Sequence, residues 1–394
     1  MMPFICALIL IFIIVHLMLA FVLLTQVLAS LLYKSQPRFD IKNACPTVAI
    51  IVPAHNEANG IAETLQSILP QLREQDRLIV VADNCVDDTA AISRNLGAEA
   101  IERHDTSKRG KGYALDYGIR YLESNPPQVV LIVDADCILA PDAIRLLSSE
   151  CLRRQRPVQA LYLMKNSMQA NVKSRISEFA WIVRNQVRPL GMKFLGLPCQ
   201  LMGTGMAFLW QDICQAKLAS GHIVEDMKLG LDLALQGKPP LFLPDALVTS
   251  QFPSENSASD TQRTRWEHGH LSVIIQDLPK LFIHAIKFKN LNTLAMGLDL
   301  VLPPLTLFVS TALILSMVSL VIYLFQPVAW LVIGPMILLA TILISVGLAW
   351  LKYGRDVVSL QQLCCVPVYM IKKIPIYIKF LVRRQLDWVR SKRD

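Results

Sequence analysis

Hydrophobic residues are concentrated in two charge-free runs near the ends of the chain. Residues 1–33 contain no Asp, Glu, Lys or Arg, and neither do residues 300–351. A helix formed by the second run would extend ~78 Å, roughly twice what a ~30 Å hydrocarbon core requires once some tilt is allowed. Gln326-Pro327 is the natural turn in that run. The pattern therefore predicts one N-terminal and two C-terminal transmembrane helices.

Between these runs, short apolar segments alternate with helical periodicity. Residues 47–52, 77–83, 98–102 and 129–134 are typical of buried strands, and the segments between them space their apolar residues as helices do. This alternation predicts a parallel sheet covered on both faces, with ligands bound beyond the carboxyl ends of its strands. The stretch contains neither GxGxxG nor GxxxxGK[ST], so the dinucleotide fingerprint and the P-loop are absent.

Positive charges indicate how the chain crosses the membrane. Lys34 and Arg38 follow the first run, Lys287 and Lys289 precede the second, and Lys352 follows the third span. All lie on one side if the N-terminus is outside and three spans are crossed, so we expect a cytoplasmic soluble domain in a multi-pass protein of the inner or plasma membrane. A cleaved signal peptide is the alternative, but it would carry a basic start.

The predicted domains follow in order. They are an N-terminal transmembrane helix (1–33), a cytoplasmic domain (34–267), an interfacial amphipathic helix (268–292), two transmembrane helices (293–351) and a basic amphipathic tail (352–394).

Composition agrees with a membrane protein and excludes other classes. Apolar residues make up 53% and charged residues 18% of the chain, which argues against disorder. The net charge of +8 is concentrated in residues 352–394, with ten Lys or Arg against three Asp, so nucleic acid is not an expected partner. This tail is built like a helix that lies on anionic lipid, although a fourth span through 357–382 is the alternative.

The nine cysteines are scattered and show no metal-ligand spacing. We expect reduced thiols, without disulfides or structural zinc. His268 and His270 diverge on a helix and are not expected to form a metal pair.

Acidic residues follow the predicted strands. Asp134 and Asp136 stand at the end of the fourth strand, where two close carboxylates favour a divalent cation such as Mg²⁺ or Mn²⁺. The alternative is a pair of solvated loop acids. Asp83 ends the second strand, a position that helix capping does not explain.

Three further clusters each have a structural alternative. The basic run at 108–112 opens a helix and favours phosphate oxygens, unless it is a solvated face. Glu225-Asp226 begins a helix, where acids also stabilise the helix dipole. The segment 262–266, QRTRW, would otherwise be an aromatic anchor at the membrane interface.

Taken in order, the strand-end Asp, DxD, ED and QxxRW motifs resemble the membrane-integrated family 2 glycosyltransferases. That family includes cellulose, hyaluronan and poly-N-acetylglucosamine synthases and ceramide glucosyltransferases. The resemblance covers roughly residues 45–290 and the membrane arrangement. It implies an α/β fold of the GT-A type, a Rossmann-like nucleotide-sugar transferase domain inserted between transmembrane helices and accompanied by interfacial amphipathic helices.

The resemblance also implies roles for individual residues. Asp226 matches the general base, and Asp134 and Asp136 match the metal ligands. The donor contacts implied are Ala54, His55, Glu57, Asp83, Lys111, Asp134 and Arg265. The acceptor contacts implied are Gly203, Thr204, Gly205, Gln262 and Trp266. The two C-terminal spans are fewer than many polysaccharide synthases have, which puts a long translocation channel in doubt.

We therefore expect inverting, metal-dependent transfer of a sugar from a nucleotide-diphosphate sugar, with UDP favoured, to a glycan or lipid-linked acceptor. A β-linkage and a role in exopolysaccharide or cell-surface glycan synthesis follow from the resemblance, with membrane lipids and unidentified export proteins as further partners. One alternative is transfer of a single sugar to a lipid. Another is an inactive module that binds a sugar nucleotide for a secretion complex.

Overall fold

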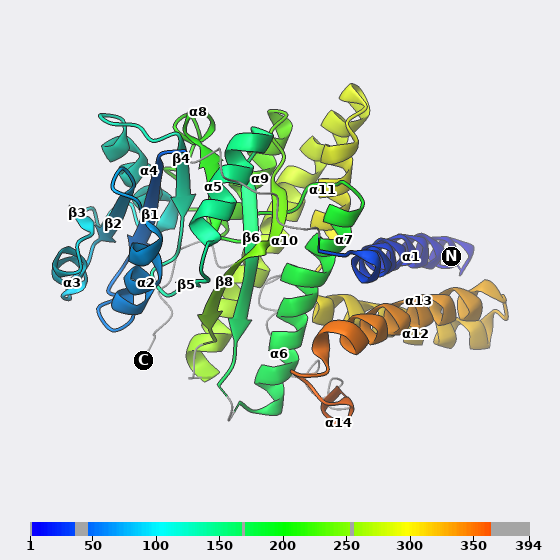
Figure 1. Cartoon of the computed structure of the whole chain (residues 1–394). Coiled ribbons are helices and arrows are strands. Elements are labelled where there is room, and N and C mark those ends of the chain that lie inside the picture. Colours follow the sequence, from blue (N-terminus) through cyan, green and yellow to red (C-terminus); the bar gives the residue numbers. More distant parts are fainter. Residues whose placement is uncertain (1, 36–45, 168–169, 253–255, 364–394) are drawn as a thin grey trace. The chain divides into compact units, whose positions relative to one another are not determined.

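The computed structural model describes residues 2–35, 46–167, 170–252 and 256–363, and the side chains of 256–263 are outside the description. The chain divides into two compact units. We call them the sheet unit, which holds all the described strands, and the helical unit, which holds the long apolar helices (Figure 1). Each is described by itself.

The sheet unit is built on a sheet of eight strands in the order β3-β2-β1-β4-β7-β6-β8-β5. The strands are β1 (Val48–Ala54), β2 (Arg77–Asp83), β3 (Glu99–Arg103), β4 (Val129–Ile132), β5 (Ile138–Leu139), β6 (Val158–Lys165), β7 (Met206–Leu209) and β8 (Leu241–Gln251). The first four in this order are parallel, which confirms the prediction for residues 47–134. Beyond β4 the sheet is mixed, because β7 runs antiparallel to both β4 and β6.

The helices of the sheet unit are α2 (Ile61–Ile68), α3 (Thr89–Asn95), α4 (Lys111–Leu122), α5 (Ala143–Arg154), α8 (Trp210–Ile213), α9 (Glu225–Leu235) and α10 (Asn256–Phe288), with a 3₁₀ turn at Leu69–Gln71. Apolar residues of α4 and α9 form one core with β1, β2, β4 and β7. Gly118 lets α4 approach the sheet closely, since a Cβ there would lie 3.1 Å from both Ile51 and Val81. α10 continues across the predicted boundary at residue 267.

The strand order places a topological switch point between β1 and β4. From β1 the chain builds outward through β2 and β3, and it then returns to add β4 on the other side of β1. The connections at the carboxyl ends of β1 and β4 therefore separate, which leaves the crevice where α/β sheets bind ligands.

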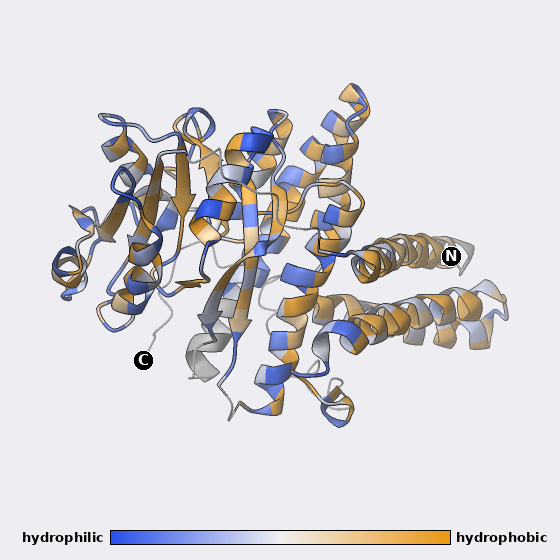
Figure 2. Cartoon of the chain, in the orientation of Figure 1, coloured by the Kyte–Doolittle hydropathy of each residue, from blue (hydrophilic) through white to orange (hydrophobic). Residues whose placement is uncertain are grey.

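The helical unit contains the three predicted apolar spans. Its helices are α1 (Met2–Leu32), α6 (Val172–Ile182), α7 (Arg188–Phe194), α12 (Leu305–Phe325), α13 (Trp330–Ala349) and α14 (Leu360–Leu363), with π-helical turns at Val183–Val187 and Trp350–Gly354. Among the residues that the structure describes, three segments are long and apolar enough to cross a membrane, Phe4–Leu32, Leu305–Phe325 and Trp330–Gly354 (Figure 2). This confirms one N-terminal and two C-terminal candidate spans, with the turn at Gln326-Pro327. Residues 364–394 lie outside the description, so the structure of the basic tail stays a prediction.

The helical unit also includes α6 and α7, which the predicted organisation left within the soluble domain. α1 and α7 approach so closely that a Cβ on Gly191 would lie 2.0 Å from the carbonyl oxygen of Gln26. α1 packs against α13 in a similar way, because Gly334 faces Ile13.

A largely buried charge pair links α1 and α7 of this unit to Asp299. Arg188 of α7 lies 2.7 Å from Oδ1 of Asp299, and it also donates to the Asp299 carbonyl at 2.6 Å. Gln26 of α1 donates to the same carboxylate at 2.8 Å and accepts from Arg188 at 3.2 Å. Asp299 lies in α11 (Leu291–Val301), before the span that begins at Leu305. Asp299 is thereby neutralised by a partner inside the helical unit.

Replacing Asp299 by Ala should destabilise the helical unit strongly. The Arg188 guanidinium would remain buried without its carboxylate, which typically costs about 3–5 kcal/mol. Thermal unfolding in detergent measures the loss, with Asp245→Ala as a control at a partly exposed acid of the sheet unit. Combining Asp299→Leu with Arg188→Met should recover most of the stability, because no unpaired charge is left. Equal stability of Asp299→Ala and wild type would show that the pair contributes nothing.

Candidate active site

A pocket opens at the carboxyl ends of β1, β2 and β4, where the switch point places it. Its lining includes Ala54 at the end of β1 with His55 and Glu57 beyond it, Asp83 at the end of β2 with Asn84 beyond it, Asp134 and Asp136 after β4, Lys111 of α4 and Arg265 of α10. Every predicted donor contact and both predicted metal ligands therefore line one pocket of the sheet unit.

Asp134 and Asp136 sit on a tight turn after β4. Thr204 fixes the turn by accepting the Asp134 N–H at 3.0 Å, and the Cys137 N–H closes it by donating to the Asp134 carbonyl at 3.1 Å. In the described part of the chain, the ligand atoms of Asp134, Asp136 and Cys137 lie within 4.8 Å of one another. Burial raises the pKa of the Cys137 thiol, so this sulfur stays protonated. The two carboxylates are the fitting ligands for a hard divalent cation.

Lys111 lies at the centre of the acidic groups. Its Nζ is 2.5 Å from Asp134 Oδ1, donates to the Gly203 carbonyl at 2.7 Å and lies 3.7 Å from Glu225 Oε1. Burial lowers the pKa of Lys111, but the nearby carboxylates of Asp134 and Glu225 outweigh it and raise the pKa overall. The ammonium is therefore charged across the physiological range.

Gly203 lies between the predicted donor contacts and the predicted general base. A Cβ on Gly203 would lie 3.4 Å from Asp226 Oδ2, 3.7 Å from Lys111 Nζ and 3.9 Å from Asp134 Oδ2. The predicted general base thus lies beside the predicted metal ligand. Gly203 has a φ of +92°, a conformation that favours glycine. A larger residue at this position would strain the backbone and would also fill the space between these groups.

Glu225 is an addition to the predicted site. It begins α9, and burial raises the pKa of its carboxyl to about 7, although Lys111 opposes the rise. Asp226 next to it raises the pKa further. The adjacent Val224 is held by α10, because a Cβ on Gly269 would lie 2.7 Å from the Val224 side chain. Close packing of α10 thereby positions both acids of the ED motif.

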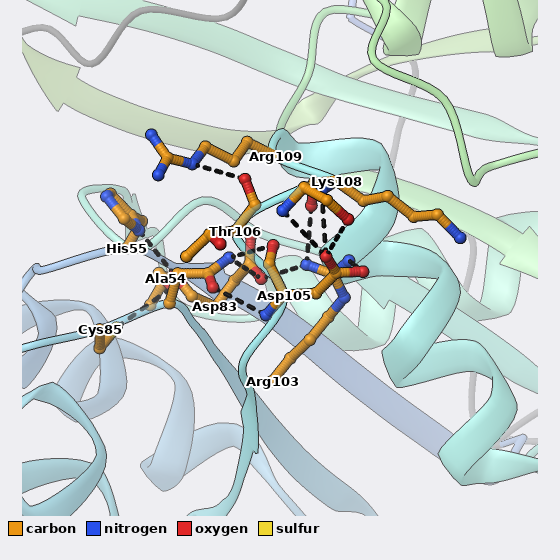
Figure 3. A network of polar contacts seen from close by, with 11 residues as sticks. Ala54, His55, Asp83, Cys85, Arg103, Asp105, Thr106, Lys108 and Arg109 are labelled. Atoms are coloured by element: carbon orange, nitrogen blue, oxygen red, sulfur yellow. Dashed lines mark hydrogen bonds and ion pairs between the residues drawn. The ribbon is translucent and has the colours of Figure 1, made fainter.

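Asp83 belongs to a polar network at the ends of β2 and β3 (Figure 3). Arg103 pairs with Asp83 at 2.6 Å, and Asn84 donates to the same oxygen at 3.0 Å. Burial raises the pKa of Asp83, while Arg103 opposes the rise. His55 lies 2.6 Å from the Asp83 carbonyl. Arg103 also pairs with Asp105 at 3.2 Å. Arg103 and Asp105 were not among the predicted site residues, because the Arg103–Asp83 pair depends on the pairing of β2 with β3 and not on a sequence motif.

Two asparagines shape the loops that carry these residues. Asn56 and Asn84 follow β1 and β2 with φ of 54° and 53°, the left-handed region that Asn tolerates. Asn84 accepts the Asp105 N–H at 2.8 Å and donates to the Asp105 carbonyl at 3.2 Å. Asn56 accepts the Val86 N–H at 2.7 Å. These bonds lock neighbouring loops together at the edge of the pocket.

The predicted acceptor residues lie in two places, in the segment before β7 and in α10. Thr204 is fully buried beneath Asp134, and Gly205 packs against Ala160 and Val248, where a Cβ would lie 2.8 Å from each side chain. Trp266 is half-buried in α10, next to the pocket residue Arg265. Gln262 also lies in α10, among the residues whose side chains are outside the description. Acceptor contacts by these residues stay predictions.

Comparisons with known proteins agree with this geometry. The family model "Glycosyltransferase like family 2" matches residues 46–269, more than half of the chain. The chain therefore belongs to glycosyltransferase family 2.

Two curated relatives are similar over the same region. A probable glycosyltransferase, YdaM, of Bacillus subtilis is 26% identical over 264 residues, covering 60% of this chain and 58% of the relative. An N-acetylglucosaminyltransferase of Rhizobium leguminosarum bv. viciae is 24% identical over 261 residues, covering 62% and 61%. The matches thus span less than two thirds of the length of these relatives.

A solved structure extends the likeness to most of the chain. The mannosyltransferase PcManGT from Pyrobaculum calidifontis, in complex with GDP-Man and Mn²⁺, aligns with a TM-score of 0.53 and 17% identity. The alignment covers 87% of this chain and 99% of that one. Together with the family match, it establishes the predicted GT-A fold.

The raised pKa of Glu225 predicts a pH-dependent stability. The folded protein holds this proton up to a pKa of about 7, whereas an unfolded glutamate loses it near its ordinary pKa of 4.5, so wild type loses stability as pH rises between these values. The amide of Glu225→Gln does not titrate in this range, so the variant does not lose stability in this way. Its midpoint of thermal unfolding, relative to wild type, should therefore be higher at about pH 8 than at about pH 5.

The exposed Glu123→Gln is the matched control and should show no such dependence on pH. An equal difference between wild type and Glu225→Gln at both pH values would contradict the raised pKa.

Proposed function

We propose that this protein is a membrane-integrated transferase that moves a sugar from a nucleotide diphosphate to a glycan or lipid-linked acceptor at the cytoplasmic membrane face. The observation that carries the proposal is the convergence of Asp226, Lys111 and Asp134 around Gly203, beside the switch-point pocket that Lys111 and Asp134 line in a family 2 fold. A base and groups that can hold a metal-bound diphosphate are thereby adjacent, as transfer between two bound substrates requires.

The donor side is formed by residues of the sheet. Asp134 and Asp136 would hold Mg²⁺ or Mn²⁺, and the structural relative contains Mn²⁺ together with GDP-Man. A divalent cation bound there supplies positive charge for the departing diphosphate. Arg265 lines the same pocket and offers a planar guanidinium for phosphate oxygens. Asp83, oriented by Arg103, suits the ring N–H of uracil or guanine, and we favour a UDP-sugar.

The reaction follows from the position of Asp226. Its carboxylate accepts the proton of the acceptor hydroxyl while that oxygen attacks the anomeric carbon. The bond between this carbon and the diphosphate oxygen breaks, and the diphosphate leaves with the electron pair. Attack from the opposite face inverts an α-linked donor to a β-linked product. Trp266 would offer a ring face to a sugar acceptor.

Exposed residues of α10 support the proposal that the enzyme acts at a lipid surface. Ile275, Ile283 and Ile286 are exposed at helical spacing, and Ile286 is 78% exposed. Lys280 and Lys287 are exposed on the same helix. Apolar residues beside lysines are typical of a helix that lies at a lipid surface, and they support the interfacial helix expected at residues 268–292.

The proposed activity can be tested on membranes that contain the protein. Incubation with a panel of radiolabelled UDP- and GDP-sugars should consume one of them, and label in polymer or in lipid distinguishes an exopolysaccharide from a glycolipid product. Asp226→Asn should lower turnover by ~10²–10⁴, the usual effect of losing a positioned base, and leave donor affinity nearly unchanged.

Asp232→Asn is the control for this experiment. It changes a partly exposed acid of the same helix, which pairs with Lys228, and turnover should stay within a few-fold of wild type. Full turnover in Asp226→Asn would remove this residue from the mechanism. Consumption of no nucleotide sugar, despite binding, would favour the inactive module.

The membrane orientation is a separate prediction. A cysteine introduced at Gln326 should react with a membrane-impermeant thiol reagent added outside intact cells, whereas cysteines at Lys34 and Lys352 should react only after permeabilisation. These variants are made after the native cysteines are replaced by Ser. Labelling of all three positions from outside would overturn the cytoplasmic site.

A further inference from the structure

The pocket concentrates negative charge around one lysine. The carboxylates of Asp134 and Asp136 lie side by side, and those of Glu225 and Asp226 approach from the first turn of α9. Lys111 Nζ is in contact with Asp134 at 2.5 Å and with Glu225 at 3.7 Å. The ammonium therefore neutralises the same carboxylate that is suited to hold a divalent cation.

The backbone of Lys111 is fixed, and its side chain alone can move. A Cβ on the adjacent Gly112 would lie 2.4 Å from the carbonyl oxygen of Leu218 and 2.8 Å from that of Ser220. The start of α4 is thus packed closely against this loop, so rotation of the Lys111 side chain is the less costly way to move the ammonium from Asp134. The four-carbon stem of the side chain can still carry the ammonium to a new partner.

We propose that Lys111 is an internal counter-ion that occupies the cation position on Asp134 until the nucleotide and the metal bind together. This inference rests on the proposed function, because it requires a diphosphate and a divalent ion in this pocket. A metal on Asp134 repels an ammonium bound to the same carboxylate, so a metal that arrives alone must displace the lysine. A diphosphate gives the ammonium another anionic partner, and the carboxylate becomes available to the metal.

This arrangement couples the two binding events. Lys111 weakens the binding of the metal alone and strengthens the binding of the nucleotide, so removing it should change the two affinities in opposite directions. A lysine that only contacts phosphate would leave the affinity for the metal alone unchanged. The sign of the change for the metal alone therefore separates the two roles.

The experiment compares Mn²⁺ binding by wild type and Lys111→Met, using the full chain in detergent and the EPR signal of free Mn²⁺. Titrations are run with Mn²⁺ alone, with UDP and with GDP. Without nucleotide, Lys111→Met should bind Mn²⁺ roughly tenfold more tightly than wild type. The nucleotide should increase Mn²⁺ affinity less in the variant than in wild type. Lys111→Gln, measured beside it with a thermal melt of each, should behave in the same way.

Two controls isolate the position of the charge. Lys108→Met removes the same charge from an exposed site three residues earlier, and it should leave Mn²⁺ affinity within about twofold of wild type. Lys111→Arg keeps the charge and should keep Mn²⁺ binding weak. Unchanged or weaker binding of Mn²⁺ alone by both folded neutral variants would overturn the inference, as would equal tightening in Lys108→Met.

The result also distinguishes this inference from the proposed function. If UDP and GDP fail to promote Mn²⁺ binding to wild type, and Asp136→Asn changes nothing, the metal-dependent transferase itself is wrong. If nucleotide promotes Mn²⁺ binding to wild type but neither neutral variant binds Mn²⁺ alone more tightly, the transferase stands and the counter-ion role of Lys111 is wrong.

Discussion

Repulsion among carboxylates is the constraint on which the site depends. Asp134, Asp136, Glu225 and Asp226 are brought together by two elements distant in sequence, the turn after β4 and the start of α9. Lys111 relieves part of this repulsion in the structure. The remaining negative charge, together with burial, raises the pKa of Glu225. A site of this kind favours cationic ligands. Repulsion among its carboxylates destabilises the folded protein, and a bound cation relieves that repulsion.

The sheet makes this concentration of charge possible. Parallel strands β1, β2 and β4 bring their carboxyl ends to one edge, and the switch point opens a crevice there. The antiparallel β7 then brings residues 203–205 beneath Asp134, where Thr204 accepts its N–H. In the helical unit, too, a charged group is neutralised by a partner of opposite charge. Arg188 and Asp299 are buried there because each is paired with the other and both contact Gln26.

The sequence was informative where local pattern determines structure. β-Branched apolar runs predicted β1 to β4, and charge-free runs predicted the three apolar spans. The acids and Lys111 could be identified as site residues because they follow strands or open helices. Pairings between distant segments were not predictable. Neither the Arg103–Asp83 pair nor the Arg188–Asp299 pair has a spacing signature, because each depends on which elements the fold makes neighbours. The mixed half of the sheet was missed for the same reason.

The architecture separates two kinds of recognition in the proposed reaction. Donor residues lie on strand ends whose positions are fixed by hydrogen bonds of the sheet and by the Asn56 and Asn84 turns. The expected base Asp226 lies on α9 and the expected acceptor residues Gln262 and Trp266 lie on α10, and these helices are held by side-chain packing such as Gly269 against Val224. Helices held by packing can shift with changes in a few side chains, whereas strand ends cannot shift without disrupting the ladder. In this scheme the strand ends keep most of the expected nucleotide contacts constant, and we expect acceptor choice to depend mainly on residues of α9 and α10.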